Sequence, residues 1–401
     1  MRQPIDALRE QHPLKSGEKE ADWRKRLTEA GIARFVDRDY TFEARRAIVA
    51  SPAGFSPTVW RTLAELGLLG LTLPVEHGGF GGGAQDAMSL MSAIGEALIV
   101  EPWLATVGTA AQLVARGGTD AQKRRLLPAV AEGTITLAFA HAEPGARHDV
   151  AHVTTCADAD GGGHALTGHK CAIAHADAAD LLVVSARTGA AGAGGSGVAL
   201  FLVDRAAAGV RVTPRRMLDG TRAADVALDA VRVPADARLG TGDDALPLIA
   251  HVIDFATALV CAEAAGAIGA ANRDTLEYLK TRRQFGVPIG AFQALQHRMV
   301  DMTIEHEQVR SMARLACAAV DGTQDAAARA RIVSAAKVKV ADACRRVSQE
   351  SVQLHGGMGM TAELKISHTF RRLTAIAQQF GDADHHLQRF AALSPLDESP
   401  E

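Results

Sequence analysis

Arg282-Arg-Gln-Phe-Gly-Val-Pro-Ile-Gly-Ala-Phe-Gln293 is the stretch that decides the fold of this chain. It begins with a guanidinium, a planar forked cation suited to phosphate, and ends with an amide that both donates and accepts hydrogen bonds. A second stretch, Gln353-Leu-His-Gly-Gly-Met-Gly-Met-Thr-Ala-Glu363, follows about seventy residues later. Its adjacent glycines let backbone N–H groups approach a phosphate without an intervening Cβ. Together the two stretches favour binding of a phosphate-bearing ligand.

The sequence around these stretches has a pattern typical of helices. Residues Ala256 to Ala271 are apolar almost all round, and a helix without a polar face is buried among other helices. We therefore expect a four-helix bundle from residue 246 onward. Further helices are expected at Thr361–His368, Arg371–Phe380 and Asp384–Leu393, before a disordered tail, 394–401.

The preceding region has a period of two. Four segments alternate or are continuously apolar, and turn clusters separate them. The expected strands are Thr134–Ala140, Leu181–Ser185, Val198–Val203 and Asp225–Leu228. Short strands at regular spacing predict a small antiparallel barrel or sandwich.

Helical periodicity also marks the N-terminal third, beyond a polar and frayed start of about twenty residues. The expected helices are Ala21–Val36, Thr41–Val49, Pro57–Leu66, Ala84–Ile99 and Thr119–Ala131. The predicted fold is therefore mainly α with a central β domain, that is, helices, a β-barrel and a helical bundle. The expected domains are 1–135, 136–245 and 246–401.

Composition limits the possible partners. The 401 residues carry a formal net charge of −3, which gives no sign of a nucleic-acid or anionic-membrane partner. No signal peptide and no apolar stretch of about 18 residues is evident, so we expect a cytoplasmic protein without a membrane span. The five cysteines fit no zinc spacing, and His141, His148 and His152 lack matching carboxylates or cysteines, so no metal site is expected.

Four stretches, in order and with family spacing, resemble the acyl-CoA dehydrogenases. The segment 66–82, Leu66-Gly-Leu-Leu-Gly-Leu-Thr-Leu-Pro-Val-Glu-His-Gly-Gly-Phe-Gly-Gly, is similar to the family loop "LGLLGL-P-E-x-GG-G". Phe139-Ala-His-Ala-Glu-Pro-Gly and Leu166-Thr-Gly-His-Lys170 resemble "TEPxxGSD" and "xLxGxK". The two stretches quoted first are close to "RxxFGxPIxxFQ" and "QxxGGxGxxxE". The resemblance spans roughly residues 30 to 390.

The resemblance implies a fold, a cofactor and a reaction. It implies FAD as cofactor, held across a subunit boundary in an obligate oligomer, and an acyl-CoA thioester as substrate, oxidised between Cα and Cβ. The expected electron acceptor is an electron-transfer flavoprotein or a similar carrier. Residues carried over as FAD contacts are Phe139, Arg282, Phe285, Gln293, Gln353, Gly356 and Gly357.

The end of the chain resembles one branch of the family. Phe380-Gly-Asp-Ala-Asp-His-His-Leu-Gln-Arg-Phe, together with the stretch at Phe139, is most similar to the small-subunit branch typified by pimeloyl-CoA dehydrogenase. Members of that branch commonly work beside a homologous large subunit. The resemblance therefore implies either a homo-oligomer or a heterotetramer, and a place in fatty acid or dicarboxylate degradation.

The middle region departs from the family pattern. Where the family has Gly-Ser before Asp, this chain has Arg147 and His148, and His148 is a candidate phosphate donor. Where the family has Trp-x-Thr beside the flavin, this chain has Ala172-Ile-Ala174. The lost hydroxyl leaves backbone N–H groups or His175 to serve flavin N5.

The usual catalytic base is missing. The reaction needs a carboxylate near Cα and donors to the thioester oxygen, where enolate charge develops. The family's Glu falls on Phe380, which accepts no proton but keeps its backbone N–H. The alternative family position falls on Ala256. Asp254, two residues earlier, is the candidate base, with Glu263 as a second candidate that also reads as a buried ion pair.

Three functions remain open on these residues. The first is an FAD-dependent acyl-CoA dehydrogenase with an unconventional base. The second is a catalytically silent FAD-binding subunit that serves an active homologous partner. The third is a flavin monooxygenase of the same fold.

Overall fold

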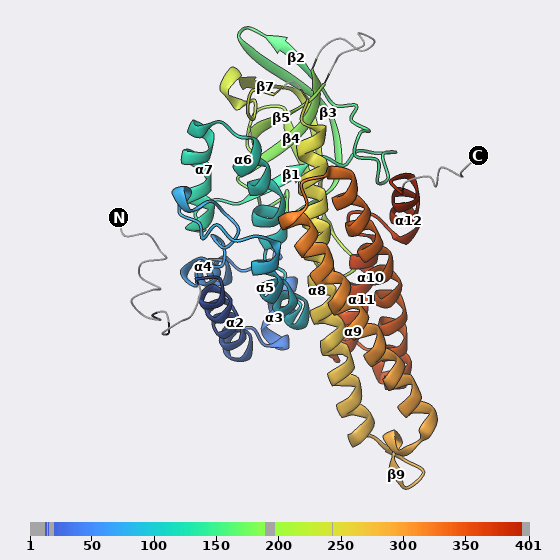
Figure 1. The fold of residues 1–401 in the computed structure, drawn as a ribbon. Coiled ribbons are helices and arrows are strands. Elements are labelled where there is room, and N and C mark those ends of the chain that lie inside the picture. The colour runs from blue at the N-terminus through green and yellow to red at the C-terminus, as the bar shows by residue number, and fades with distance from the viewer. Residues whose placement is uncertain (1–12, 14, 16–19, 189–196, 243, 395–401) are drawn as a thin grey trace, which may run out of the picture. The chain divides into compact units, whose positions relative to one another are not determined.

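The computed structural model describes residues 13, 15, 20–188, 197–242 and 244–394 (Figure 1). These residues divide into two compact units, each described here by itself. One contains residues up to Arg34, Glu43–Asp86 and Val100–Ala256; the other contains Phe35–Phe42, Ala87–Ile99 and the chain from Thr257 onward. The predicted domain limits at 135 and 245 stay a prediction.

The predicted N-terminal helices are confirmed, with ends shifted by a few residues. They are α2 (Glu20–Asp39), α3 (Phe42–Ala50), α4 (Pro57–Glu65), α5 (Ala84–Ala97) and α7 (Asp120–Ala131). Local chemistry explains two starts. Ser56 accepts a hydrogen bond from the Val59 N–H with Pro57 in the first helical turn, and Thr119 forms a capping box with Gln122. A short 3-10 turn, η1 (Val75–His77), lies between α4 and α5.

One helical segment was not predicted. It consists of a π-helical stretch, η2 (Leu104–Ala110), that continues into α6 (Ala111–Gly117). Residues 105–114 are all buried and mostly small or apolar, so this part of the sequence shows no polar face and no helical period. The Thr106 hydroxyl donates to the Leu137 carbonyl oxygen at 2.9 Å and accepts from the Leu137 N–H at 3.2 Å, which ties η2 to the first strand.

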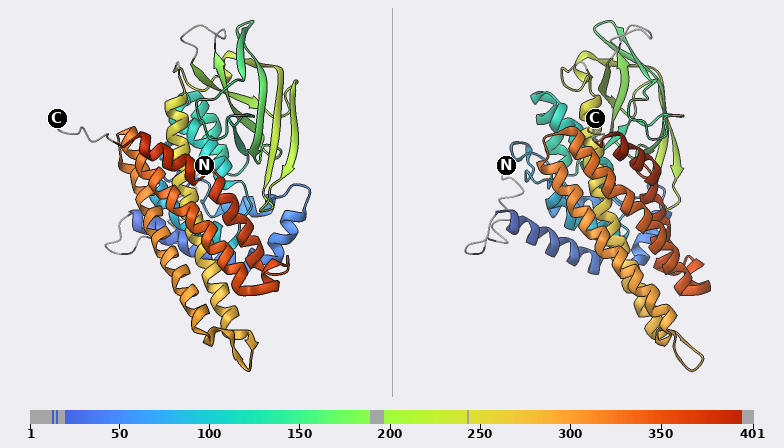
Figure 2. Two further views of the ribbon diagram at one scale, coloured as in Figure 1. Left: turned by 90° about the vertical axis from the view of Figure 1, so that its right-hand side faces the viewer. Right: turned by 45° about the vertical axis from the view of Figure 1, so that its right-hand side comes forward.

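Seven strands form one curled sheet (Figure 2). The four predicted strands are confirmed as β1 (Leu137–Ala140), β4 (Leu181–Thr188), β5 (Val198–Asp204) and β7 (Arg222–Pro234). The sequence reading missed β2 (Cys156–Asp160), β3 (Gly163–Ala174) and β6 (Val210–Arg216), which carry polar and exposed residues and so lack an apolar period. The 3-10 turn η3 (Ala235–Ala237) follows β7.

The sheet is mixed, which corrects the expectation of an antiparallel barrel or sandwich. Its order is β1-β4-β2-β3-β7-β6, with β5 also paired to β4. β1 and β2 each run parallel to β4, and the other pairs are antiparallel. Parallel strands need a long connection, and the β2–β3 hairpin lies within the connection from β1 to β4. Side chains such as Leu166, Val184 and Phe201 form the core of this sheet.

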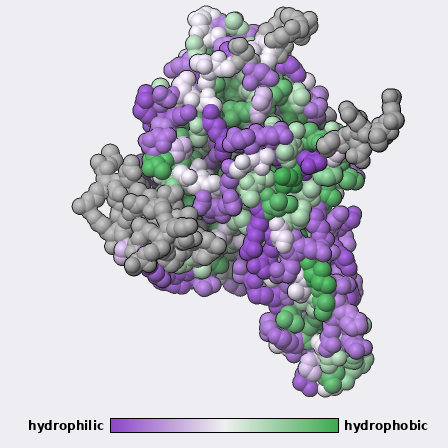
Figure 3. Space-filling view, in the orientation of Figure 1, coloured by the Kyte–Doolittle hydropathy of each residue, from purple (hydrophilic) through white to green (hydrophobic). Residues whose placement is uncertain are grey.

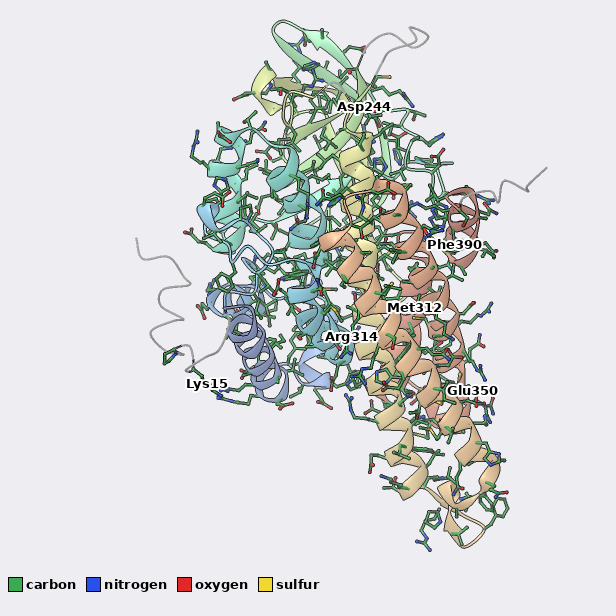
Figure 4. The ribbon with its side chains drawn as sticks, viewed as in Figure 1. Lys15, Asp244, Met312, Arg314, Glu350 and Phe390 are labelled. Carbon is green, nitrogen blue, oxygen red and sulfur yellow. The ribbon has the colours of Figure 1, made fainter. Side chains whose placement is uncertain are left out.

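The C-terminal region forms the predicted helical bundle. In Figure 1, α8 (Leu246–Thr281), α9 (Gln293–Gly322), α10 (Ala326–His355) and α11 (Lys365–Gln378) lie side by side, followed by α12 (Ala383–Ala392). Asp244, labelled in Figure 4, accepts from the Leu246 N–H at 3.1 Å where α8 begins. Glu350, also labelled there, binds Arg298 at 2.5 Å and joins α10 to α9. The described residues thus confirm the predicted class of helices, central sheet and bundle.

Two helix predictions need correction. The segments expected at Thr361–His368 and Arg371–Phe380 form the single helix α11, and the chain at 361–364 is not helical. Phe380 lies outside the helix because its φ is +60°, a left-handed conformation that ends a right-handed helix. The tail expected at 394–401 and the frayed first twenty residues lie almost wholly outside the described residues.

Helix α8 also corrects the expectation about apolar stretches. It contains an 18-residue window with a mean hydropathy of 1.7, so by length and composition it could cross a membrane. Carboxylates interrupt the apolar sequence of α8, so no unbroken apolar run of this length is visible in it. Of this window 78% is buried within the structure, as expected for a core helix of a bundle.

Candidate functional site

A tight hairpin joins α8 to α9, and three of the predicted cofactor residues lie on it or beside it in the chain: Arg282, Phe285 and Gln293. The two-residue strands β8 (Arg283–Gln284) and β9 (Val287–Pro288) pair around Phe285 and Gly286. Both turn residues have positive φ, +54° and +79°, as a two-residue type I′ turn requires. Arg282 precedes the hairpin, and its N–H donates to the Tyr278 carbonyl oxygen at 2.8 Å.

The side chains of this hairpin point into open space. Phe285 is 89% exposed, an unusual value for an aromatic residue, and its ring lies edge-on to the Phe292 ring at 6.1 Å. Arg282 and Gln293, the first residue of α9, are exposed as well. A large apolar side chain at a strained, left-handed position is a feature that a monomer would not need.

The end of α10 carries the remaining predicted residues of this unit. Gln353 is exposed on the last helical turn, and Gly356 has φ +59° and ψ −145°, a conformation open only to glycine. Gly357 begins the 3-10 turn η5 (Gly356–Met360) together with Gly356. A Cβ placed on either glycine would meet no described atom within 4 Å, so the space beside this backbone is open.

One ring contact brings the two stretches together. Tyr278 lies one turn before Arg282, and His355 immediately precedes Gly356; their rings stack at 4.4 Å. The structure therefore places Arg282, Phe285 and Gln293 at the same end of the bundle as Gln353 and the glycine pair. Phe139, the other predicted cofactor residue, lies on β1 in the other unit, where it stacks on His141 at 5.1 Å.

The position of the missing base is a loop between α11 and α12. Phe380 occupies it with φ +60°, and Gly381 follows with φ +122°. The Phe380 N–H makes no hydrogen bond to any described residue. Ala256, the alternative position on α8, is fully buried.

The two candidate carboxylates on α8 have different surroundings. Asp254 has no exposed surface. Glu263 is held by Arg372 through two hydrogen bonds, of 2.6 Å from Nε and 2.8 Å from Nη2, so the ion-pair reading of Glu263 is the one that the structure presents. The helices α5 and α8 pack closely at Glu263. A Cβ added to Gly95 of α5 would overlap the Glu263 carbonyl oxygen.

A buried ion pair lies on the sheet and was not predicted. Lys170 on β3 donates to Glu143 at 2.7 Å, and both side chains have no exposed surface. Glu143 also accepts from the N–H and hydroxyl groups of Thr154 and Thr155. Burial opposes ionisation, but the hydrogen bonds from Lys170 and the threonines prevail and hold the Glu143 pKa at about 2. The only signal in the sequence was that both residues stand inside the family-like motifs.

His141 extends this cluster. Its Nδ1 lies 2.9 Å from the Ser185 hydroxyl, which in turn accepts from Lys170 at 3.0 Å. Burial, and then the charge of Lys170, lower the His141 pKa to about 4, so the ring is neutral near pH 7. A neutral ring beside a hydroxyl that already accepts from Lys170 takes its proton on Nε2 and accepts on Nδ1.

The strand edge expected to face the flavin offers few donors. A β-bulge interrupts the β3–β7 register between Lys170 and Ile173, and Ala172 and His175 take positive φ. The Ala172 N–H donates to Asp225 at 3.0 Å, and the His175 N–H donates to the Arg222 carbonyl oxygen at 3.0 Å. The backbone donors expected at these two positions are therefore already engaged.

The remaining residues of this region form no metal site. Arg147 is exposed with φ +50°, and His148 follows it on the same loop. Within the described ranges, no three His, Cys, Asp or Glu side chains gather closely enough to hold a metal ion.

A flavin dinucleotide fits the bundle end of this chain better than the sheet. The guanidinium of Arg282, the open backbone at Gly356 and Gly357 and the exposed ring of Phe285 match a pyrophosphate and an adenine. On the sheet, Ala172 and Ala174 provide no hydroxyl for the flavin ring.

Family comparison agrees with this arrangement. Models of the acyl-CoA dehydrogenase N-terminal, middle and C-terminal domains match residues 24–134, 138–231 and 246–392. The chain belongs to the acyl-CoA dehydrogenase family. Its members bind FAD and are oxidoreductases.

Individual relatives cover most of the chain. It is 36% identical to acyl-CoA dehydrogenase FadE12 of Mycobacterium tuberculosis over 80% of this chain and 83% of that protein. Among solved structures, the Tcur3481–Tcur3483 steroid ACAD is 32% identical with a TM-score of 0.80, covering 93% of this chain and 97% of that one. The ChsE4–ChsE5 complex of Mycobacterium tuberculosis is 25% identical with a TM-score of 0.83, covering 97% and 100%.

Proposed function

We propose that this chain is a subunit of an FAD-dependent acyl-CoA dehydrogenase that holds its cofactor across a subunit boundary. The observation that carries the proposal is the exposed group of Arg282, Phe285, Gln293, Gln353 and the glycine pair at one end of the bundle. These residues are exposed at one end of the bundle, as expected for half of a shared dinucleotide site.

Exposed apolar side chains on one face of α9 are evidence that a partner subunit binds there. Val300, Ile304 and Leu315 are 57%, 49% and 47% exposed. They lie 7, 11 and 22 residues after Gln293, spacings close to whole turns, so they share its side of the helix. Figure 3 shows apolar side chains among polar ones on the bundle. Such a face on a protein without a partner is unusual.

Each residue has a role in binding. Arg282 neutralises phosphate charge with a forked cation, while Gly356 and Gly357 bring backbone N–H groups close to it. Gln293 and Gln353 hydrogen-bond the ribityl and adenine portions, and Phe285 and Phe139 provide aromatic surface. When bound, FAD accepts the hydride that leaves Cβ of the acyl group.

Groups of this chain then bind the thioester oxygen and remove the α-proton. The free Phe380 N–H donates to the thioester oxygen, where negative charge develops. Asp254, a fully buried carboxylate of α8, is the candidate base within this chain. An electron-transfer flavoprotein or a similar carrier would be the electron acceptor of the reaction.

A second candidate is a silent subunit whose homologous partner supplies the base. Two observations favour it: Phe380 stands at the usual base position, and the Ala172-Ile-Ala174 segment has no hydroxyl for the flavin while its Ala172 N–H already binds Asp225. The similarity to two-protein complexes such as ChsE4–ChsE5 points the same way. In this case the chain would form a heterotetramer with a large subunit, as in the pimeloyl-CoA dehydrogenase branch.

Anaerobic titration of the purified holoprotein with an acyl-CoA distinguishes the candidates. Bleaching of the flavin absorbance by the chain alone supports an autonomous dehydrogenase. Bleaching only after addition of a homologous partner supports the silent subunit. Oxygen uptake linked to NADH, without any acyl-CoA, would instead indicate a monooxygenase and contradict both.

Substitution of Asp254 tests the base directly. If Asp254 removes the α-proton, Asp254→Asn slows flavin reduction by about 10²–10⁴-fold while FAD stays bound. An unchanged reduction rate would remove Asp254 from the mechanism and leave the partner subunit as the source of the base.

A further inference from the structure

The loop that carries Phe380 is held by buried groups from other parts of the bundle. Lys337 on α10 is fully buried, and its ammonium donates to three carbonyl oxygens: Ile376 at 3.0 Å, Ala377 at 3.2 Å and Gly381 at 2.7 Å. The first two belong to the last turn of α11, and the third lies directly after Phe380. One cation thus ends the helix and fixes the loop.

His386 on α12 holds the other side of the same residue. Its Nε2 lies 3.1 Å from the Phe380 carbonyl oxygen, and its Nδ1 lies 3.2 Å from the Ser334 hydroxyl. Burial, followed by the charge of Lys337, lowers the His386 pKa to about 3, so the ring is neutral. Because a carbonyl only accepts, the single ring proton is on Nε2, and Ser334 donates to Nδ1.

A third group reaches the preceding residue. Arg372, anchored by Glu263, donates through Nη2 to the Gln379 side-chain oxygen at 3.3 Å. Residues 379, 380 and 381 are therefore each tied to a different partner. Gly381 cannot be replaced without disturbing this arrangement, since a Cβ there would lie 2.6 Å from Nε2 of His386.

These contacts fix a strained peptide in one orientation. A phenylalanine at φ +60° costs free energy that the surroundings must supply. The carbonyl oxygens of Phe380 and Gly381 are both bound from inside the bundle, by His386 and Lys337 respectively. The Phe380 N–H is left without a partner among the described residues.

We propose that Lys337 and His386 are positioning residues that aim the Phe380 N–H at the thioester oxygen of the acyl-CoA. The inference rests on the proposed function, because it assumes that an acyl-CoA binds at this loop. Neither residue touches the substrate. They act by holding the carbonyl groups of Phe380 itself and of the next residue, Gly381, so that the donor needs no reorganisation when charge develops on the thioester.

The arrangement argues against a purely packing role for Lys337. Burying an ammonium is costly, and an apolar side chain of similar length would fill the same volume without that cost. The three hydrogen bonds of its ammonium go to carbonyl oxygens, not carboxylates, so the gain lies in fixing the backbone. The sequence holds a signal for this role: Lys337 interrupts the apolar face formed by Val333, Ala336 and Val340.

Infrared difference spectroscopy tests the proposal on the holoprotein. The probe is crotonyl-CoA labelled with ¹³C at the thioester carbonyl, an enoyl product that the oxidised protein does not consume. A donor aimed at the carbonyl oxygen lowers its stretching frequency. We expect a downshift with the wild-type protein and loss of most of that downshift in Lys337→Met.

A matched control lies two residues away. Lys339→Met removes the same charge from α10, but Lys339 pairs with Glu305 at 2.7 Å and does not reach the loop, so its downshift should equal that of the wild type. If acyl-CoA turnover is measured as well, the loss in Lys337→Met should fall on kcat, by about 10²-fold, more than on KM. An unchanged downshift in folded Lys337→Met overturns the proposal.

A second pair of variants decides the matter if Lys337→Met does not fold. His386→Gln keeps an N–H donor near the position of Nε2, whereas His386→Leu removes it. Retention of the downshift in the first variant and its loss in the second supports the proposal, and equal downshifts in both overturn it. A bound probe with no downshift in the wild-type protein is a different result, because it contradicts the proposed function itself.

Discussion

Arg372 of α11 forms a bidentate ion pair with Glu263 of α8. Its Nε donates a hydrogen bond to one carboxylate oxygen and its Nη2 donates to the other. The side chains are 13% and 3% exposed, so both charges are withdrawn from water. Breaking a buried pair by removing one partner leaves the other charge uncompensated. The pair explains why a carboxylate on the apolar helix α8 need not be a catalytic base.

The first prediction concerns Glu263→Gln. We expect the free energy of unfolding to fall by about 3–5 kcal/mol, because Arg372 stays buried without a counter-charge. Urea denaturation measures this. Glu277→Gln, on the same helix, removes an exposed partner of Lys280 and should change stability by less than about 1 kcal/mol. A stable Glu263→Gln protein that no longer reduces flavin would instead make Glu263 the base.

The second prediction concerns the exposed ring of Phe285. Phe285→Ala should leave the stability of the separate protomer unchanged, because the ring is 89% exposed there, yet lower the FAD content and weaken the oligomer. Flavin absorbance and sedimentation velocity measure the two effects. Leu218→Ala, at another exposed apolar side chain, is the control. Full retention of FAD and assembly in Phe285→Ala would exclude a shared site at this hairpin.

The third prediction separates the two adjacent glycines. Gly356→Ala forces an L residue to φ +59° and ψ −145°, so the cofactor-free protein should lose about 1–3 kcal/mol of stability. Gly357→Ala has no such strain and meets open space, so the cofactor-free protein should keep its stability. We expect its Kd for FAD to rise roughly tenfold, which corresponds to about 1.4 kcal/mol. Unchanged FAD affinity in Gly357→Ala would show that the backbone at Gly357 does not contact the cofactor.

The fourth prediction concerns acid. His141 and His386 have pKa values of about 4 and about 3 in the folded protein, below the ordinary value of 6.5. The unfolded chain therefore binds protons first as the pH falls, and stability present above pH 6.5 is lost toward pH 3. We expect each histidine to lower the unfolding free energy by about 2 kcal/mol between pH 7 and pH 5.

Urea titrations at pH 7 and pH 5 check this expectation. His386→Gln should show a smaller difference between the two pH values than the wild type. His297→Gln, at an exposed residue of α9, should show the wild-type difference. Below about pH 4.5 a further loss is expected, since Glu143 has a folded pKa of about 2 and its pairing with Lys170 is lost as it is protonated.

Much of the fold follows from local patterns. Helical period and capping residues predicted α2, α3, α4, α5 and α7, and alternation predicted β1, β4, β5 and β7. The pattern failed where burial was not one-sided. Residues 105–114 are all buried, and β6 is exposed along most of its length, so neither shows the period of its own structure.

The sequence by itself determined the class of protein, because the residues of its glycine-rich and arginine-bearing motifs are adjacent along the chain. Tertiary structure alone decided which partner each buried charged group meets. Glu143 meets Lys170 across 27 residues, Lys337 meets Gly381 across 44, and Glu263 meets Arg372 across 109. Such pairs form when separate elements pack and exclude water, and no local spacing encodes which side chains then face each other.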